Sequence, residues 1–172
     1  MQKIVVVLGG ARSGKSYYAL KNASCIKGNK AFIATAEALD DEMFKRIENH
    51  KKERGPGWTT YEEPIHIAPL ISRIKNKYDV ILLDCLTLWV SNIMHSGHNV
   101  IKEAGNLVNA LSAVYPVPLY IISNEVGLGL VPDYPLGREY RDNLGQVNRL
   151  VAEVASDVIL MVAGIPLKIK GG

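Results

Sequence analysis

The sequence predicts an α/β fold built around a mostly parallel sheet. Short apolar runs that are typical of buried strands alternate along the chain with segments that are typical of helices. No internal repeat interrupts this alternation, and no change in composition marks a linker. We therefore expect residues 1–172 to form a single domain whose ligands lie at the carboxyl ends of the strands.

Three strands and three helices are expected in the first half of the chain. The first strand, KIVVVL at 3–8, is apolar and stops at two glycines, as a buried strand entering a tight loop does. Residues 40–54 begin with acidic side chains, end with basic ones and precede Gly55, which predicts a helix and its stop. The other elements are a helix over 16–24, a strand over 30–36, a turn with a short extended piece within 55–64, and a helix over 65–77.

The second half of the chain continues the alternation. Residues 78–87 (YDVILLDCLT) and 117–125 (VPLYIISNE) are apolar runs with polar residues near their ends, as expected of central strands. An amphipathic helix is predicted over 140–154, where apolar residues recur at spacings of 4, 3, 4 and 3. Those residues are Tyr140, Leu144, Val147, Val151 and Val154. A helical segment around 100–114 and two last strands, DVILMVAG and PLKIK, complete the expected fold.

The composition is that of an ordered globular protein, with 48% apolar and 22% charged residues and no low-complexity tract. The 20 basic residues nearly balance the 17 acidic ones, and a net charge of +3 gives little support for nucleic-acid binding. No apolar run is long enough to suggest a transmembrane segment, so we expect a cytoplasmic protein. Cys25 and Cys85 lie far apart, and we expect buried thiols rather than a disulfide.

The most specific motif is GGARSGKS at 9–16, which fits the pattern G-x-x-x-x-G-K-S between a predicted strand and a predicted helix. In this pattern the glycines let backbone N–H groups surround phosphates, and the helix adds its positive N-terminal end. Lys15 would neutralise the β- and γ-phosphates, and the Ser16 hydroxyl would bind Mg²⁺. The alternative, a glycine-rich turn without a ligand, is disfavoured by the complete motif. A P-loop alone does not separate a small-molecule kinase from a motor or a switch protein.

Asp84 ends the apolar run VILLD and is the natural second ligand for the metal ion of a nucleotide site. In the alternative interpretation, its carboxylate caps a helix that begins near Leu86. Both interpretations put Asp84 at the edge of the sheet where ligands bind.

His50 lies in the basic stretch FKRIENHKKERGPGW at 44–58. On the predicted helix it shares a face with Met43, Ile47 and Arg54, at spacings of 4, 3 and 4. A histidine on such a stripe is more often a packed or capping residue than a catalyst. A neutral imidazole can also attack phosphorus as a nucleophile, and the neighbouring basic side chains would counter triphosphate charge. Spacing alone leaves both roles open.

Two weaker signals lie in the second half of the chain. His95 and His98 form an H-x-x-H pair, but no third ligand is evident, and a polar loop is favoured over a metal site. Asn124 and Glu125 end a predicted strand on the ligand side, where they could contact a substrate or a metal ion.

Five segments, in order across nearly the whole chain, resemble the bifunctional adenosylcobinamide kinase/adenosylcobinamide-phosphate guanylyltransferases of cobalamin biosynthesis. They are GGARSGKS, IATAEALDDEMFKRIENHKKER with Trp58 downstream, LLDCLTLWVSN, SNEVGLGLVP and REYRDNLGQVNR. This ordered set is far more specific than the P-loop alone. The resemblance implies a P-loop NTPase fold with a RecA-like, mostly parallel sheet flanked by helices, Mg²⁺ as cofactor, and a homotrimer with sites near subunit contacts.

In that family the histidine of the R-I-x-x-H pattern takes up GMP as a covalent phosphoramidate, and His50 stands at this position. The resemblance also implies a guanine-nucleotide site made of the residues that match the family's own. These are Gly9, Gly10, Ala11, Arg12, Ser13, Gly14, Lys15, Ser16, Thr35, Ala36, Glu37, Lys51, Lys52, Glu53, Arg54, Glu62 and Asp84, with Ser16 and Asp84 at the metal ion.

The resemblance predicts two reactions. The first phosphorylates adenosylcobinamide on its aminopropanol hydroxyl with ATP or GTP, and the second transfers GMP from GTP through the histidine to give adenosylcobinamide-GDP. The expected partners are therefore a corrinoid and nucleoside triphosphates, without nucleic acid. Two alternatives are a P-loop kinase for another small molecule, in which His50 is structural, and a RecA-like nucleotide-switched or nucleic-acid-binding protein.

Overall fold

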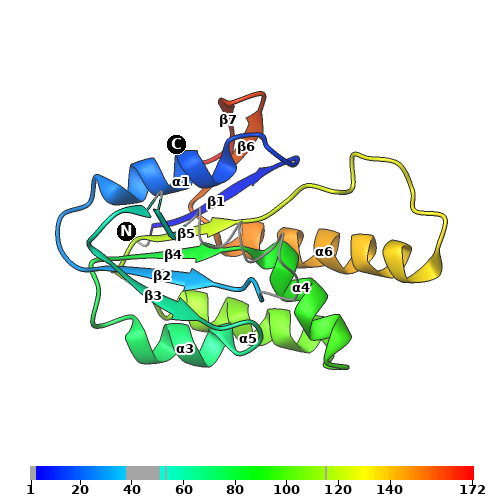
Figure 1. Ribbon diagram of the computed structural model, residues 1–172, viewed down its shortest axis with the longest axis horizontal. Helices are drawn as coiled ribbons and strands as arrows, with labels where there is room; N and C mark the ends of the chain where they lie inside the picture. The colour runs from blue at the N-terminus through cyan, green and yellow to red at the C-terminus, as the bar shows by residue number, and fades with distance from the viewer. Residues whose placement is uncertain (1–2, 38–50, 53, 115) are drawn as a thin grey trace.

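The computed structural model of the chain describes residues 3–37, 51–52, 54–114 and 116–172, which form a sheet with helices on both faces (Figure 1). The strands are β1 (Ile4–Gly9), β2 (Lys30–Ala34), β3 (Trp58–Glu62), β4 (Val80–Asp84), β5 (Leu119–Ile122), β6 (Asp157–Val162) and β7 (Ile165–Lys170). The helices are α1 (Lys15–Ser24), α3 (Ile67–Ile74), α4 (Leu86–His95), α5 (Val100–Ser112) and α6 (Pro135–Val154). No helix in these ranges is long and apolar enough to cross a membrane.

The sheet has the order β3-β2-β4-β5-β1-β6-β7, and every neighbouring pair is parallel except β6 and β7. This confirms the predicted mostly parallel α/β fold. The carboxyl ends of β1, β2, β4 and β5 therefore meet at one edge of the sheet. In Figure 1 the arrowheads of β2 and β4 point towards this edge, from which α4 and α6 extend.

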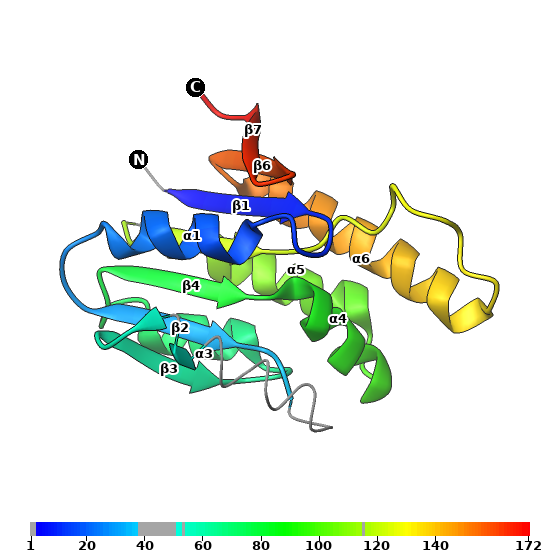
Figure 2. The ribbon, with the colours of Figure 1, turned by 45° about the horizontal axis from the view of Figure 1, so that its top comes forward.

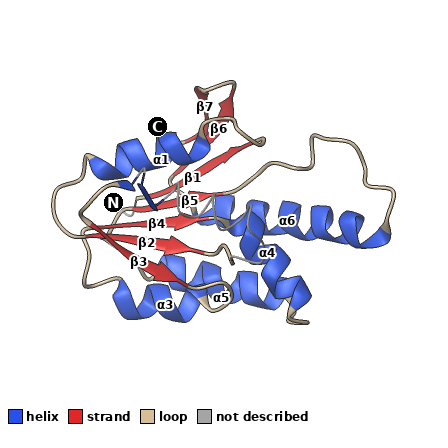
Figure 3. Cartoon of the chain, viewed as in Figure 1, coloured by secondary structure: helices blue, strands red, loops and turns tan. Residues whose placement is uncertain are grey.

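Alternate residues of the strands enter two separate cores, as the pleat requires. Val5 and Val7 of β1 pack with Ala19 on the face that α1 covers. Ile4 and Val6 pack on the other face, against apolar side chains of α3, α4, α5 and α6. Figures 2 and 3 show this arrangement, with α1 on one side of the sheet and α3, α5 and α6 on the other. The sheet edge that carries the strand ends lies between these two layers.

Most predicted elements are present, but several boundaries differ. The strand expected over 78–87 ends at Asp84, and α4 begins at Leu86. The sequence hides this change because buried apolar residues stand on both sides of Asp84. The last long helix begins at Pro135 rather than 140, since proline fits the first helical position, where no N–H donor is needed. Of the helix expected over 40–54, residues 51–52 and 54 are helical, and the rest lies outside the described residues.

The two cysteines are free, but the expectation that both are buried is wrong for Cys25, which is exposed, and Cys85 is half-buried. Cys25 follows the last turn of α1 and is exposed, with its Sγ 3.3 Å from the carbonyl oxygen of Lys21. Cys85 lies between β4 and α4, beside the strand ends.

Candidate active site at the carboxyl ends of the strands

The loop between β1 and α1, residues 9–16, has the conformation that a phosphate cradle requires. Gly9 has a φ of 148°, and a Cβ at this position would lie 2.6 Å from the carbonyl oxygen of Met161. Gly14, directly before α1, has a φ of 90°, and Arg12 has a φ of 57°. Within the described chain no side chain caps the start of α1. Its first N–H groups and its positive helix end are thus available to an anion.

Lys15 is held inside this loop by its first-turn position on α1. The residue is only 8% exposed, and its Nζ donates to the carbonyl oxygen of Gly10 at 2.6 Å. Burial lowers the pKa of the Lys15 ammonium from its ordinary value, and the neighbouring Cys85 and Asp84 oppose part of that effect. A phosphate in the loop would stabilise the charged form of Lys15, because a phosphate is an anion.

Thr35 fixes the end of β4, where Asp84 lies. Thr35 is fully buried, and its Oγ1 accepts from the backbone N–H of Cys85 at 2.8 Å and donates to the carbonyl oxygen of Cys85 at 2.7 Å. Its own N–H donates to the carbonyl oxygen of Asp84 at 3.0 Å. Both hydrogen bonds of the Thr35 hydroxyl are therefore made to the main chain beside Asp84. That Thr35 belongs to the nucleotide site stays a prediction.

Replacing Thr35 with valine, which has nearly the same shape, is expected to destabilise the protein by about 1–3 kcal/mol, because the N–H of Cys85 loses its partner away from water. Urea unfolding measures this loss. The matched control is Thr35→Ser, which keeps the hydroxyl and should retain most of the stability. If valine and serine gave the same unfolding midpoint as threonine, the two hydrogen bonds would not be what holds this strand end.

The strand ends and the loop together surround a cleft of about 690 Å³. Its wall combines the loop between β1 and α1 with residues from β2, β4, α4 and the segment after β5. The lining residues are Ala11, Arg12, Ser13, Gly14, Lys15, Ser16, Tyr17, Phe32, Ala34, Ala36, Arg54, Asp84, Cys85, Thr87, Leu88 and Asn124. Cations from the loop and from Arg54 face the carboxylate of Asp84 across a volume suited to a nucleotide.

Most of the predicted nucleotide-site residues meet at this cleft. Residues 11–16, Ala36, Arg54 and Asp84 line it. Gly9 and Gly10 form the entry to the loop, whereas the exposed residues Glu37, Lys51, Lys52 and Glu62 lie outside the lining. His50 and Glu53 fall outside the described residues.

Arg54 joins the helical residues after His50 to the cleft wall. Its guanidinium carbon lies 3.9 Å from the centre of the Phe32 ring, and Nη1 donates to Thr60 Oγ1 at 3.3 Å. Burial lowers the pKa of Arg54, and the carboxylates of Asp84 and Glu62 oppose part of that effect. Lys51 lies nearby in sequence and pairs with Glu62, with Nζ 3.0 Å from Oε1. This side of the cleft therefore carries positive charge suited to a triphosphate.

Cys85 offers a sulfur atom beside the same cleft. Burial, followed by the charge of Asp84, raises the pKa of the Cys85 thiol to about 11. The thiol is neutral at pH 7, and Cys85 is accordingly a poor nucleophile for phosphorus.

The segment after β5 is tied to α4 and α6 by a chain of hydrogen bonds. The N–H of Asn124 donates to Thr87 Oγ1 at 2.8 Å, and Asn148 Nδ2 donates to the carbonyl oxygen of Asn124 at 3.0 Å. Tyr140 donates its hydroxyl to the carbonyl oxygen of Thr87 at 3.1 Å. Asn124 thus lines the cleft on the ligand side, as predicted, whereas Glu125 accepts from the N–H of Gly127 at 2.7 Å and shapes the loop.

The two histidines of the H-x-x-H pair have separate partners. His95 Nδ1 lies 2.7 Å from the carbonyl oxygen of Ser91, and His98 Nδ1 lies 2.7 Å from Ser96 Oγ. Across the described ranges, no group of three or more histidine, cysteine, aspartate or glutamate side chains could hold a metal ion. The pair is thus used in local hydrogen bonds at the end of α4.

Phe32, Thr87 and Leu88 were not predicted as site residues. Alternation along the strand at 30–36 could have grouped Phe32 with Ala34, because residues two apart share a face. Nothing local in the sequence indicates which face borders the cleft. Thr87 and Leu88 follow Asp84 directly, and the sheet-edge rule could have included them had the helix start been placed at Leu86.

Comparison with known proteins confirms the family resemblance. The sequence model of the family described as "Cobinamide kinase / cobinamide phosphate guanyltransferase" matches residues 5–169. The bifunctional adenosylcobalamin biosynthesis protein CobU of Escherichia coli (strain K12) is 36% identical over 184 residues, covering 97% of this chain and 99% of the relative. CobP of Pseudomonas aeruginosa, with the same description, is 38% identical over 168 residues, covering 96% of each chain.

Among solved structures, a KaiC-like protein from the hyperthermophilic archaeon Pyrococcus horikoshii OT3 has a similar fold. The TM-score is 0.52 with 14% sequence identity, over 92% of this chain and 70% of that protein. This likeness supports the RecA-like fold class and is limited to the fold.

Proposed function

Because the chain belongs to the cobinamide kinase / cobinamide phosphate guanyltransferase family, we propose that it transfers GMP through a covalent bond to His50. The protein is a bifunctional enzyme of adenosylcobalamin biosynthesis. The two alternatives, a kinase for another small molecule and a nucleic-acid-binding protein, are therefore excluded. Its substrates are cobinamide and nucleotides. We propose the covalent route for the second reaction, GMP transfer, and the residues that act in the two reactions.

The observation that supports this route most strongly is the position of the residues that follow His50. Lys51 pairs with Glu62 at the end of β3, and Arg54 stacks on Phe32 in the cleft wall. Arg54 follows His50 by four positions in the sequence, and it brings positive charge to the cleft in which a triphosphate would bind.

In the first reaction the cobinamide hydroxyl attacks the γ-phosphorus of ATP or GTP, with Lys15 and the loop N–H groups neutralising phosphate charge. The new oxygen–phosphorus bond forms as the bond to the bridging oxygen breaks, the nucleoside diphosphate leaves with the electron pair, and the hydroxyl proton passes to solvent. In the second reaction an imidazole nitrogen of His50 attacks the α-phosphorus of GTP. A nitrogen–phosphorus bond forms, and the bond to the bridging oxygen breaks as pyrophosphate leaves with the electron pair. A phosphate oxygen of cobinamide phosphate then attacks the same phosphorus, the nitrogen–phosphorus bond breaks, and cobinamide-GDP is released.

Exchange between pyrophosphate and GTP tests the covalent route. With GTP and labelled pyrophosphate but no corrinoid, the wild-type protein should move label into GTP, because the first half of the transfer is reversible without the acceptor. Direct displacement by cobinamide phosphate would require the corrinoid, so exchange that appears only when cobinamide phosphate is added would contradict the covalent route.

Mg²⁺ is expected at Ser16 and Asp84, whose oxygen atoms are the ligands this ion prefers. Both residues line the cleft, and the charge of Asp84 acts on Lys15 and Arg54, so the donor set fits a divalent cation beside the phosphates. When bound, the ion would supply positive charge that stabilises negative charge developing on the phosphate oxygens.

Asp84→Asn is expected to raise the Mg²⁺ concentration needed for half-maximal kinase rate by about tenfold, because an amide oxygen carries no formal charge. A Mg²⁺ titration of the kinase rate at saturating nucleotide measures this. The matched control is Asp79→Asn, at the amino-terminal side of the same strand. An unchanged Mg²⁺ requirement in Asp84→Asn would remove Asp84 from the metal site.

Two further expectations stay predictions. The family resemblance implies a homotrimer, which sedimentation equilibrium can test by comparing the mass in solution with the 18.9 kDa of one chain. The cytoplasmic location accords with the use of nucleoside triphosphates, and cell fractionation can test it.

A further inference from the structure

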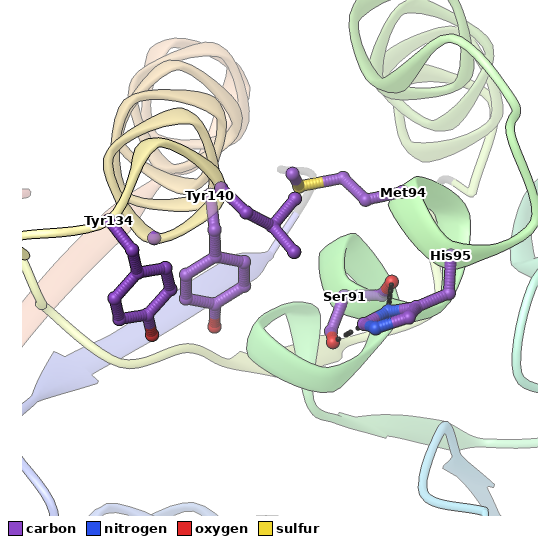
Figure 4. A pocket seen from close by; sticks show the side chains of 7 residues that line it. Ser91, Met94, His95, Tyr134 and Tyr140 are labelled. Carbon is purple, nitrogen blue, oxygen red and sulfur yellow. Dashed lines mark hydrogen bonds between the residues drawn. The ribbon is translucent and has the colours of Figure 1, made fainter.

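A second pocket lies beside the cleft, between α4 and the first turns of α6. Its volume is about 450 Å³. The lining residues are Ser91, Met94, His95, Tyr134, Leu136, Gly137 and Tyr140. Figure 4 shows Tyr134 and Tyr140 on one side of this α4–α6 pocket and Ser91 and His95 on the other. The mechanism above uses none of these seven residues.

The chemistry of the α4–α6 pocket differs from that of the cleft. No lysine, arginine, aspartate or glutamate of the described chain lines it, whereas the cleft carries Arg12, Lys15, Arg54 and Asp84. Two tyrosine rings, a thioether and a leucine provide an apolar wall. A phosphate would find no counter-charge here. A ligand with a large apolar surface and no anionic group would be well accommodated.

Polar groups at the pocket are neutral hydrogen-bonding partners. His95 Nδ1 lies 2.7 Å from the carbonyl oxygen of Ser91, so in the neutral ring Nδ1 donates and Nε2 is the acceptor. Ser91 and Tyr134 supply hydroxyl groups, which both donate and accept. This set matches carboxamides, which present an N–H₂ donor and a carbonyl acceptor.

The pocket is also built in advance of any ligand. A Cβ on Gly137 would lie 2.7 Å from atoms of the Tyr134 ring, so the glycine lets that ring lie against the bare backbone of α6. Tyr140 is fixed by its hydrogen bond to Thr87, and Asn143 Nδ2 lies 3.6 Å from the sulfur of Met94. Rings held in this way lose little conformational freedom when a ligand binds.

One helix connects the pocket to the cleft. Thr87 and Leu88 of α4 line the cleft, and Ser91 and His95 of the same helix line the pocket. At a rise of 1.5 Å per residue, these positions are about 4.5–12 Å apart along the helix axis. The Tyr140 hydrogen bond to Thr87 crosses between the two sites. A ligand larger than the pocket can therefore extend a reactive group into the cleft.

The loop from Asn124 to Tyr134 runs from the cleft to the pocket and is fixed by α6. Arg138 Nη1 donates to the carbonyl oxygens of Pro132 and Asp133, at 3.0 and 2.7 Å, and Arg141 donates to that of Gly127. The loop side chains of Leu128, Leu130 and Val131 nevertheless face solvent. So do the pocket residues Tyr134 and Leu136, at 63% and 54% exposed. Such an apolar surface beside a formed pocket indicates a ligand that covers it.

We propose that the α4–α6 pocket binds the corrin body of cobinamide, while its hydroxyl, and later its phosphate, extends into the cleft. Cobinamide combines an extended apolar ring with many carboxamide groups, which is the chemistry that the pocket accommodates. The assignment rests on the cobinamide activity of the family and does not depend on the covalent role of His50. It divides the substrates between a charged cleft for the nucleotide and a neutral pocket for the acceptor.

The test compares two leucines that are equally exposed. Leu136→Asn makes the pocket wall polar without adding charge or much volume. Leu167→Asn makes the same change on edge strand β7, where Leu167 is 55% exposed. Equilibrium dialysis with cobinamide, followed by its visible absorbance, should show binding weakened about tenfold in Leu136→Asn and unchanged in Leu167→Asn. Tyr134→Ala, a second pocket variant, should weaken cobinamide binding at least as much.

Steady-state kinetics supply a readout that general damage would not give. In Leu136→Asn the KM for cobinamide should rise about tenfold, with kcat and the KM for GTP within about twofold of wild type. Equal losses for cobinamide and GTP would overturn the assignment, as would wild-type cobinamide binding in both pocket variants. A change of oligomeric mass in Leu136→Asn would likewise overturn it, because the pocket would then be an interface between copies.

The same variants separate this inference from the covalent route. Pyrophosphate–GTP exchange without corrinoid should persist in Leu136→Asn and Tyr134→Ala, since that half reaction needs no acceptor. Normal exchange together with normal cobinamide binding in both variants would overturn the pocket alone. If the pocket variants bound cobinamide more weakly but the wild-type protein showed no pyrophosphate–GTP exchange, the pocket assignment would be supported. The covalent route would then be contradicted.

Discussion

Lys15→Ala is expected to weaken binding of both ATP and GTP by about 100-fold, and both reactions should be lost together. The Lys15 ammonium lies inside the phosphate-binding loop at 8% exposure, where water screens it little. A charge-assisted interaction in such a site contributes up to about 3 kcal/mol, which corresponds to roughly 100-fold in affinity. Calorimetry with non-hydrolysable analogues of the two nucleotides measures the loss directly.

The control for this variant is Lys21→Ala, in the last turn of the same helix. The Lys21 ammonium lies 5.9 Å from the centre of the Tyr17 ring, and Lys21 is not among the residues that line the cleft. Its removal should therefore leave nucleotide affinity within about twofold. If Lys15→Ala bound both nucleotides as tightly as Lys21→Ala did, the loop would not be the phosphate site. A loss confined to one reaction would show that the two reactions do not share this loop.

His50→Ala is expected to reduce GMP transfer by at least about 1,000-fold while the kinase rate stays within about fivefold of wild type. The transfer has no covalent route without the imidazole, and a nucleophile that supplies about 4 kcal/mol to the barrier accounts for a factor of this size. The kinase reaction uses the substrate hydroxyl as its nucleophile, so it does not require His50. Separate assays with cobinamide and with cobinamide phosphate measure the two rates.

His98→Ala is the control for removal of an imidazole, because His98 is exposed and its ring hydrogen bonds to the neighbouring Ser96. Both rates should stay near wild type in this variant. GMP transfer at the wild-type rate in His50→Ala would show that the histidine is structural, as the spacing of Ile47, His50 and Arg54 on one helix face also allows.

The central sheet could be predicted because strands covered on both faces consist of nearly continuous apolar residues that end in polar ones. The end of β4 could not be placed, since Leu86 and Trp89 of α4 are as buried as Leu82 of the strand. Hydrophobicity therefore does not change at the boundary. The early start of α6 was missed because Pro135 and Gly137 resemble loop residues when their packing is unknown.

The residues of the candidate site also differ in whether the sequence alone could identify them. Residues of a contiguous motif, such as Lys15 and Ser16, could be identified from their own segment. Phe32 and Asn124 enter the cleft only because the strand order puts β2 and β5 on either side of β4. Strand order depends on long-range pairing that a single sequence does not reveal. The Thr35 contact with Cys85 belongs to this class too, since the two residues are 50 positions apart.

The α4–α6 pocket had no sequence signal of its own. Its walls come from two helices that meet through packing, and Gly137 gains its role only from the Tyr134 ring that lies against it. Periodicity identified Tyr140 as an inward residue of its helix. Periodicity alone could not show that the Tyr140 hydroxyl reaches the main chain of Thr87.

The covalent role of His50 is tested most directly by incubating the protein with GTP labelled at the α-phosphate, without corrinoid, and locating the label in a digest. We predict label on the peptide that contains His50, with the lability to acid that a phosphoramidate shows, and none in His50→Ala. Adding cobinamide phosphate should transfer the label to the corrinoid. An unlabelled wild-type protein that still makes cobinamide-GDP, or label on any other residue, would contradict the account.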